Sequence, residues 1–420
     1  MYQYIINGRK KLSGQIDISG DKNTALKIIP STILSSEKSI ISNIPDITDI
    51  KIMLEIMEDL GVIITLLDSQ KYEFDCSNIH KTVIDPILAK KLRASTVLIG
   101  PMLARFGEVT LPHPGGCIIG QRPIDIHLDA FVKLGAKIEY HEDSYTIKAS
   151  QLSGAKISPH TVSVTGTENI IMAAALSQGT TTIEYAACEP SVIALADFLN
   201  SRGAKISGAG SPRIIIEGVD KIIGGQTTTI PDRIEAGTFF ILGAVGGGDI
   251  TINNCDPNHL EVFLSFMDQI GIKYTRDQHQ LHVYHSPDIK AKNMVTNPYP
   301  GFPTDLQAPY TILMTQTKGL SMIHETIFEG RLNYVEWLNK MGANIVSCDP
   351  HRAIVFGPTP LSGKKIVSPD IRAGIALVIA ALIAEGQSQI DNIDLVDRGY
   401  ANLDERLQSL GASVVRHQIN

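Results

Sequence analysis

The sequence predicts an α/β fold of two domains, built from six repeats of about 70 residues, three in each domain, with the most apolar helices buried. The first observation is a glycine that lies between an amphipathic helical segment and a strand. It recurs at intervals of 68 to 74 residues, as Gly61, Gly135, Gly203, Gly271, Gly342 and Gly411. A near-constant period of this length is typical of repeated supersecondary units. The other two observations are an apolar helix and short strands that recur with the same period.

Each repeat begins with a helical stretch that carries few charges, and these lie near its N-terminal end. The six stretches are residues 23–34, 93–104, 169–176, 234–244, 306–314 and 371–384. Beyond the first turn each stretch is hydrophobic on all sides, which is typical of a helix inside a core. We therefore expect α/β units stacked around buried helices.

A short strand, a loop and an amphipathic helix follow in each repeat. The segments 329–341 and 400–410 are examples of this helix, and the recurring glycine is expected to end it as a C-cap. A further strand comes after the glycine.

A second motif sets the predicted domain boundaries. It appears at residues 145–159 and 353–370, and also at residues 2–21, whereas the last repeat lacks it. We therefore expect residues 1–21 to complete the C-terminal half. The predicted domains are residues 22–229 and residues 1–21 plus 230–420, with a second crossing at the glycine- and threonine-rich segment 224–231.

The composition suits a globular enzyme, with 43% hydrophobic and 19% charged residues among 420. The net charge of −7 argues against nucleic-acid binding in bulk. We recognise no signal peptide and no bilayer-spanning apolar run, so we expect a cytoplasmic protein that does not bind membranes. Five scattered cysteines without a CxxC pair argue against a disulfide framework or a zinc site. No metal or dinucleotide motif is present either, so the sequence predicts no cofactor.

The starts of the apolar helices carry the first candidate site residues. Three of these residues are aspartates, which are common N-caps: Asp232, Asp305 and Asp370. For each of them, helix capping alone explains an aspartate at this position as well as a role in a binding site does. Four cations at helix starts oppose the helix dipole, so a bound anion would offset an unfavourable charge. They are Lys22, Arg93, Arg233 and Arg372.

The loops after the short strands carry a second group. A Pro-Gly-Gly-Cys loop places Cys117 ahead of Arg122, and a thiol between arginines suits an acid or nucleophile that acts on an anionic substrate. Arg122, Arg331 and Arg398 lie 13, 11 and 13 residues before their repeat glycines, at nearly equivalent positions. An isolated arginine of this kind is usually a surface ion-pair partner. Arginines at a shared position instead favour a substrate that bears carboxylate and phosphate.

Segments along essentially the whole chain resemble the motifs of the enolpyruvyl transferase family, in particular its members that act on UDP-N-acetylglucosamine. They are GDKNTAL (20–26), RAS with the following GP and LARFG (93–107), PGGCIIGQRPID (114–125), EP (189–190), PDRIEAGTF (231–239), FPTDLQA (302–308), ETIFEGR (325–331), DIRA (370–373) and DRGY (397–400). The resemblance implies two inside-out α/β barrel domains with buried helices aimed at a cleft. It also implies transfer of the enolpyruvyl group of phosphoenolpyruvate to the 3′-hydroxyl of a UDP-sugar, the first step of peptidoglycan precursor synthesis.

The resemblance further implies roles for the matching residues. Cys117 would deliver a proton to C3 of phosphoenolpyruvate and be the target of fosfomycin, and Asp305 would take the hydroxyl proton. The phosphate would lie against Lys22, Arg122 and Arg398, the carboxylate against Arg331 and Arg372, with Asn23 and Asp370 orienting the reacting groups. The remaining substrate-binding positions are Arg93, Gln121, Pro123, Ile124, Asp125, Ser163, Val164, Glu189, Ile327 and Phe328.

The chain departs from the family pattern mainly in the half expected to bind the nucleotide. Val97 replaces a common aromatic residue, Thr161 a common lysine, and Thr165-Gly166 the usual Gly-Ala, while Thr24 and Lys27 replace alanine and proline. Two alternatives therefore stay open. One is a paralogue that enolpyruvylates another nucleotide such as UMP, and the other is a catalytically silent homologue that only binds ligands. The intact catalytic positions argue against the silent homologue.

Overall fold

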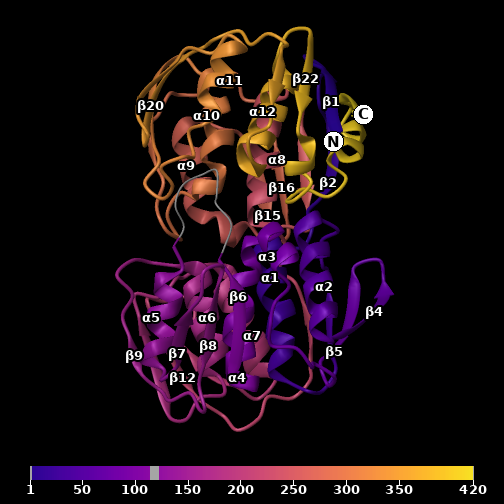
Figure 1. The fold of residues 1–420 in the computed structure, drawn as a ribbon. Coiled ribbons are helices and arrows are strands. Elements are labelled where there is room, and N and C mark those ends of the chain that lie inside the picture. The colour runs from indigo at the N-terminus through magenta and orange to yellow at the C-terminus, as the bar shows by residue number, and fades with distance from the viewer. Residues whose placement is uncertain (1, 114–122, 420) are drawn as a thin grey trace. The chain divides into compact units, whose positions relative to one another are not determined.

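The structure is a computed structural model that describes residues 2–113 and 123–419. The described chain divides into two compact units (Figure 1). We call residues 20–113 and 123–230 the N-terminal unit, and residues 2–19 and 231–419 the C-terminal unit. No helix in either described unit is long and apolar enough to cross a membrane.

The strands described in the N-terminal unit form three small sheets. Their strand orders are β13 (Gln226–Thr228), β3 (Ser39–Ser42), β5 (Lys71–Asp75), β4 (Ile63–Asp68); then β6 (Glu108–Pro112), β8 (Ser144–Lys148), β7 (Lys137–Tyr140); and β11 (Lys205–Ser207), β12 (Arg213–Glu217), β10 (Thr180–Glu184), β9 (Lys156–Ile157). Residues 226–228 belong to the first of these sheets, where they pair with β3 in parallel. The predicted crossing segment is therefore partly a strand.

The helices of the N-terminal unit are of two kinds. The more buried ones are α1 (Lys22–Ser31), α4 (Ile99–Phe106), which continues the 3₁₀ turn η2 (Arg93–Leu98), and α6 (Val164–Ala174); the others are α2 (Thr48–Leu60), α3 (Pro86–Lys91), α5 (Asp125–Lys133) and α7 (Pro190–Ser201). In α6 every residue from Gly166 to Ala174 is buried. In α2 the buried residues instead recur at helical spacing, which leaves one face in water.

The C-terminal unit has the same kinds of elements. Its sheets have the orders β21 (Lys365–Val367), β22 (Gln387–Asp391), β1 (Tyr2–Asn7), β23 (Ser413–Gln418); then β15 (Tyr274–Asp277), β16 (Gln280–Val283), β14 (Ile250–Asn253), β2 (Gly14–Asp17); and β17 (Met294–Val295), β18 (Gly319–His324), β20 (Arg352–Gly357), β19 (Ile345–Asp349). The buried helices are α8 (Arg233–Val245), α10 (Gln307–Thr315) and α12 (Ile371–Ile383), and the others are α9 (Glu261–Ile270), α11 (Val335–Lys340) and α13 (Leu403–Ser409).

The first two strands of the chain lie inside sheets of the C-terminal unit. β1 runs antiparallel between β22 and β23, with Tyr4 opposite Ile390 and Arg416. β2 pairs with β14 in parallel, with Ile16 opposite Ile252. Figure 1 shows the indigo N-terminal strands beside the yellow C-terminal segment of this unit.

The mixed α/β fold predicted from the sequence is confirmed, and so is the role of the recurring glycines. The φ angles of Gly61, Gly135, Gly203, Gly271, Gly342 and Gly411 lie between 88° and 105°, in the left-handed region that ends helices. Only glycine adopts this conformation without strain, which is why the signal was readable from the sequence.

Three predicted helix starts are wrong. α6 begins at Val164 rather than at residue 169, because Ser163 caps it by accepting a hydrogen bond from the Gly166 amide at 3.1 Å. The segment predicted as a helix over 329–341 is helical only over Val335–Lys340, and that predicted over 400–410 only over Leu403–Ser409. In both cases the residues before the helix form turns whose side chains reach other elements, so tertiary contacts override helical periodicity.

Candidate active site

In the C-terminal unit two arginines converge on the carboxylate of Asp305. Its Oδ1 accepts hydrogen bonds from Nη2 of Arg331 and from Nε of Arg372, each at 3.0 Å. The arginine side chains are 5% and 10% exposed and that of Asp305 is 26% exposed, so the cluster is shielded from bulk water yet open to a ligand. Asp305 comes from the turn η4 (Thr304–Leu306), Arg331 from the turn before α11, and Arg372 from the first turn of α12.

The electrostatics of this cluster keep Asp305 ionised. Burial acts to raise the pKa of Asp305, but Arg372 and Arg331 outweigh burial, and together with Arg233 they hold the pKa well below its usual range. Burial also acts to lower the pKa of Arg372, and the Asp305 carboxylate outweighs it and raises that pKa. Two guanidinium groups that share one carboxylate oxygen keep further N–H donors for a ligand, and guanidinium groups suit a bound anion.

Asp305 does not form the expected N-cap, whereas Asp232 and Asp370 each cap a helix, which leaves a site role open for both. No side chain caps α10, because the Asp305 carboxylate faces the two guanidinium groups instead. Asp232 caps α8 through the amides of residues 234 and 235, at 2.8 and 2.9 Å. Asp370 caps α12 through the amides of residues 372 and 373, also at 2.8 and 2.9 Å. Asp370 therefore lies directly beside Arg372.

Tyr400 holds the other side of Arg372. Its hydroxyl accepts from Nη1 of Arg372 at 3.4 Å and lies 3.0 Å from Oγ1 of Thr238, whose own hydroxyl donates to the carbonyl of Ile234. Tyr400 must therefore donate its proton to Thr238. Burial raises the pKa of Tyr400 to about 12, so it stays protonated. Arg398 lies in the turn just before Tyr400 and is partly buried.

The buried carboxylate of Glu325 shapes the loop that carries Arg331. Its Oε1 accepts from the amides of Ile327 and Phe328 at 2.8 and 3.2 Å, and its Oε2 accepts from Oγ1 of Thr304 at 2.8 Å. The loop is thus tied to the turn that contains Asp305. The guanidinium of Arg331 lies 5.0 Å from the centre of the Phe328 ring. Of the two predicted loop residues, Phe328 therefore lies beside Arg331, and Ile327 is held by the Glu325 carboxylate.

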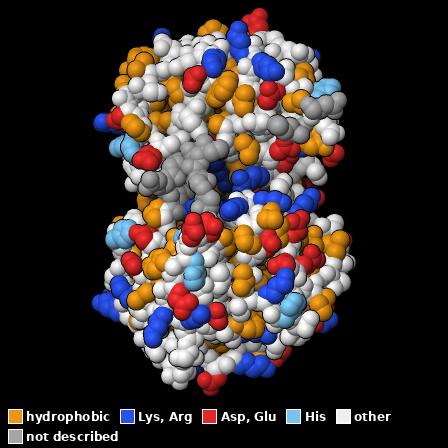
Figure 2. All heavy atoms as spheres, in the orientation of Figure 1, with side chains coloured by type: hydrophobic (Ala, Val, Ile, Leu, Met, Phe, Trp, Pro, Cys, Tyr) orange, Lys and Arg blue, Asp and Glu red, His pale blue; other side chains and the backbone are white. Residues whose placement is uncertain are grey.

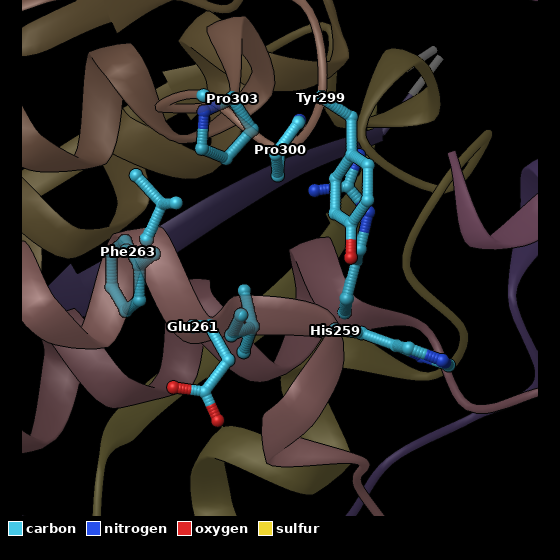
Figure 3. Close-up of a pocket in the computed structure, with 10 residues that line it drawn as sticks. His259, Glu261, Phe263, Tyr299, Pro300 and Pro303 are labelled. Carbon is cyan, nitrogen blue, oxygen red and sulfur yellow. The ribbon is translucent and has the colours of Figure 1, made fainter. Parts of the chain in front are cut away.

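A small pocket lies at the start of α8. The guanidinium of Arg233 lies 5.1 Å from the centre of the Tyr299 ring, and both line the pocket. Figure 3 shows Tyr299, Pro300 and Pro303 on one side of it and His259 and Glu261 on the other. Its cavity of about 20 Å³ has room for about one water molecule, so it is too small for a substrate. The charge of Arg233 also contributes, after those of Arg372 and Arg331, to the lowered pKa of Asp305.

In the N-terminal unit Lys22 forms a buried ion pair with Asp49. Nζ of Lys22 lies 2.6 Å from Oδ2 of Asp49, and the two side chains are 10% and 5% exposed. Asp21 caps α1 by accepting from the amide of Thr24, so Lys22 and the half-buried Asn23 stand at the very start of this helix. Asp49 compensates the charge that Lys22 places against the helix dipole. Nothing in the sequence singled out Asp49 as this partner.

Asn169 joins three elements that carry predicted binding residues. Its Nδ2 donates to the carbonyl of Thr96 at 2.8 Å, and its Oδ1 accepts from the amide of Gly100 at 2.6 Å. The same Nδ2 lies 2.9 Å from Nδ1 of His127. Burial lowers the pKa of His127 to about 4, and Arg93 adds to this effect, so the ring is neutral and accepts this hydrogen bond.

These contacts link η2, α5 and α6, each of which begins beside predicted binding residues. Arg93 opens η2, Asp125 opens α5 after the buried Ile124 and the exposed Pro123, and Val164 opens α6 after its cap Ser163. Glu189 directly precedes α7. The departure at Gly166 has a local consequence, because a Cβ at that position would lie 2.9 Å from Oγ of Ser163. An alanine would therefore force this cap to move.

Lys27 and Glu168 form a second buried ion pair in the N-terminal unit. Nζ of Lys27 lies 3.4 Å from Oε2 of Glu168, and the side chains are 6% and 0% exposed. Oγ of Ser191 donates to the other oxygen of Glu168 at 2.8 Å, so the pair links α1, α6 and α7. Burial raises the pKa of Glu168 to about 7, although Lys27 and Ser191 act to lower it.

Lys27→Met should destabilise the N-terminal unit, and increasingly so as the pH rises. Removing one partner of a buried ion pair typically costs about 3 to 5 kcal/mol. Without Lys27 the pKa of Glu168 rises further above its unfolded value. Between the unfolded and the folded pKa of Glu168, the folded state retains a proton that the unfolded state loses. The free energy of unfolding therefore falls as the pH rises through this range. Circular dichroism in urea at about pH 6 and about pH 9 would measure the free energy of unfolding.

Two further variants control this prediction. Lys27→Met with Glu168→Gln should recover much of the loss, because no buried charge remains. Lys51→Met breaks a pair with Asp46 whose side chains are 62% and 54% exposed, and it should cost at most about 1 kcal/mol. Equal losses for Lys27→Met and Lys51→Met would contradict the assigned role of the buried pair.

Three predicted site residues, Cys117, Gln121 and Arg122, lie outside the described residues. The other four cysteines are free thiols. No group of three or more histidine, cysteine, aspartate or glutamate side chains among the described residues could hold a metal ion. On the visible face of each unit, acidic and basic side chains are interspersed (Figure 2).

Known proteins match the chain over nearly its whole length. The family model described as EPSP synthase (3-phosphoshikimate 1-carboxyvinyltransferase) matches residues 6–407. The UDP-N-acetylglucosamine 1-carboxyvinyltransferase of Finegoldia magna is 41% identical over 97% of both chains, and UDP-N-acetylglucosamine 1-carboxyvinyltransferase 1 of Caldanaerobacter subterraneus is 42% identical over 99% of both. The solved enolpyruvyl transferase NikO from Streptomyces tendae has a similar fold, with a TM-score of 0.91, 22% identity and coverage of 99% of this chain and 98% of NikO. The EPSP synthase of Acinetobacter baumannii shares the fold more distantly, with a TM-score of 0.76, 17% identity and full coverage of both chains.

Proposed function

The chain belongs to the enolpyruvyl (1-carboxyvinyl) transferase family, and we propose that it transfers the enolpyruvyl group of phosphoenolpyruvate to the 3′-hydroxyl of UDP-N-acetylglucosamine, with release of phosphate. The names of relatives at about 40% identity over the full length support this acceptor. The observation that carries the chemistry is the Asp305 carboxylate between Arg331 and Arg372. It combines a base with cations that suit an anionic substrate.

The proposed reaction is an addition followed by an elimination. The 3′-oxygen of the sugar bonds to C2 of phosphoenolpyruvate while its proton passes to Asp305, and a proton from Cys117 goes to C3. The tetrahedral product then loses phosphate from C2 and a proton from C3. In the free protein Asp305 is a weak base because two arginines hold its pKa low. Once both arginines bind the substrate carboxylate, their hold on Asp305 weakens and its basicity rises.

The remaining cations divide between the two anionic groups of phosphoenolpyruvate. We assign Lys22, Arg122 and Arg398 to the phosphate and Arg331 with Arg372 to the carboxylate, with Asn23 and Asp370 orienting the reacting groups. Preorganised cations of this kind stabilise the charge that develops as phosphate leaves. The sugar nucleotide is assigned to Arg93, Gln121, Arg122, Pro123, Ile124, Asp125, Ser163, Val164, Glu189, Ile327 and Phe328.

The proposal includes the finer architecture. The six sheets and the helices packed on them support six repeats, three in each of two inside-out α/β barrel domains. The first domain, residues 22–229, would supply the Cys117 loop and the nucleotide-binding residues. The second, residues 1–21 plus 230–420, would supply Asp305, Arg331, Arg372 and Arg398. We place the enzyme in the cytoplasm at the first step of peptidoglycan precursor synthesis, with no nucleic-acid or membrane partner.

Cys117→Asp should keep appreciable turnover and lose covalent labelling by fosfomycin. A carboxylic acid can still deliver a proton to C3, whereas it cannot form the thioether that traps the inhibitor. Mass spectrometry of the intact protein after incubation with fosfomycin measures the label. Cys348→Ser, at an exposed thiol, is the control and should label as fully as the wild type. Labelling that persists in Cys117→Asp would refute the role of this thiol.

The test of the function is phosphate release from phosphoenolpyruvate with UDP-N-acetylglucosamine, run beside UMP and UDP-glucose. The proposal expects release with UDP-N-acetylglucosamine alone. Release with UMP would support the paralogue instead, the alternative that the departures at Val97, Thr161, Thr165 and Gly166 leave open. No release with any acceptor would indicate a silent homologue that keeps only the fold.

A further inference from the structure

We infer that Asn333 is a positioning residue for the proposed reaction, because it holds the second oxygen of the Asp370 carboxylate. Nδ2 of Asn333 donates to Oδ2 of Asp370 at 3.2 Å. Oδ1 of Asp370 is already engaged by the amides of Arg372 and Ala373 at the start of α12. Both carboxylate oxygens are therefore occupied, and the plane of the group is set. The inference rests on the proposed function and adds a residue to it.

The orientation of the Asn333 amide follows from its surroundings. With the amide turned around, its oxygen would face a carboxylate oxygen, and two acceptors would repel each other. Oδ1 of Asn333 is buried and has no hydrogen-bond partner among the described residues. A buried acceptor left without a partner is costly, at about 1 to 3 kcal/mol. A purely structural asparagine satisfies both ends, as Asn339 does by donating to the carbonyl of Ile345 and accepting from its amide.

The backbone of Asn333 is anchored by its neighbour. Tyr334 is fully buried, and its hydroxyl accepts from Nε2 of Gln307 at 2.8 Å and donates to Oγ1 of Thr311, also at 2.8 Å. Both partners lie on α10, directly after Asp305. The turn before α11 is thereby fixed against α10.

The same turn reaches two carboxylates. Arg331 binds Asp305 and Asn333 binds Asp370, and the two donors are separated only by Leu332. We call residues 331–334 the clamp turn. It sets the proposed base and the proposed orienting carboxylate from a single rigid segment. A shift of the Asp370 carboxylate would alter the alignment of the reacting groups, which affects turnover more than binding.

The test compares Asn333→Leu, Asn333→Asp and Asn339→Leu in the phosphate-release assay with phosphoenolpyruvate and UDP-N-acetylglucosamine. Asn333→Leu removes the donor at similar volume and should lower kcat about ten- to a hundredfold, the scale of a hydrogen bond to a charged group. Its KM for either substrate should change by less than about threefold, since the interaction matters in the transition state. Asn333→Asp keeps the shape but sets two carboxylates together, and kcat should fall at least as far.

Asn339→Leu is the matched control, on the helix that follows the clamp turn. It should lower the melting temperature and leave kcat within about twofold, because its partners hold local backbone only. If both Asn333 variants retain wild-type kcat, or lose activity only in proportion to unfolding, the inference is overturned while the proposed function stands. A wild-type protein that releases no phosphate overturns the proposed function, and the inference falls with it.

Discussion

Asp305→Ala should lower turnover at least about a hundredfold, the usual scale for a positioned group that transfers a proton. The variant removes the only carboxylate seen to bond both Arg331 and Arg372 among the described residues. Binding of phosphoenolpyruvate should weaken little or tighten, because both guanidinium groups become available to the substrate carboxylate. The loss should therefore appear in kcat rather than in KM. Steady-state kinetics of phosphate release measure both constants.

The control for this variant is Asp349→Ala. Asp349 also has a lowered pKa, caused first by its hydrogen bond from Arg352, but it lies on the β19–β20 hairpin with its side chain 30% exposed. This substitution should leave kcat unchanged. A turnover of Asp305→Ala within a few-fold of the wild type would remove Asp305 from the role of base. Thermal unfolding of each variant separates a loss of chemistry from a loss of fold.

A second expectation concerns the wild-type enzyme at acid pH. Because Arg372 and Arg331 hold the pKa of Asp305 well below its usual range, the carboxylate stays ionised far into the acid range. The value of kcat/KM should then not be lost to protonation of Asp305 at about pH 5, where an ordinary buried carboxyl would begin to titrate. This expectation applies to kcat/KM, which reports the free enzyme.

The sequence predicted well those parts of the fold that depend on local signals. The six glycines at or directly after helix C-caps have φ angles that other residues avoid, so each is visible in the sequence without knowledge of its neighbours. The apolar helices were visible because a buried helix excludes charge on every side. The start of α6 was missed because Glu168 and Asn169 looked like polar residues at a helix terminus, whereas both lie inside the helix and are fully buried.

The site residues also divide into those that a local sequence motif reveals and those that only the fold reveals. Asp305, Arg331 and Arg372 stood in motifs, and the structure joins them. Their pairing was not predictable, because it joins residues 26 and 67 positions apart through the geometry of the fold. Asp49 and His127 lacked any local signal, since each matters only through a partner brought to it by another helix. Asn333 lies in a segment whose pattern suggested a continuous helix, and its role depends on that helix starting later.

Deletion of residues 1–19 should unfold the C-terminal unit while the N-terminal unit persists. β1 is an interior strand between β22 and β23, so its removal leaves both neighbours with unpaired backbone groups, and removal of β2 exposes β14. The deletion also takes away the buried side chains Tyr4, Ile6, Leu12, Ile16 and Ile18. Burial of each such side chain contributes about 1.5 to 3 kcal/mol, whereas whole domains are stable by only about 5 to 15 kcal/mol.

The single tryptophan gives this deletion a specific readout. Trp337 lies on α11 and packs against the core of the C-terminal unit, so its fluorescence reports that unit alone. In the deleted protein the emission should shift toward that of exposed indole, and limited proteolysis should cut within residues 231–419 first. Fragments from residues 20–230 should survive as long as they do in the full chain. Unchanged Trp337 emission together with unchanged protection of residues 231–419 would mean that these strands add little, and that the C-terminal unit folds without them.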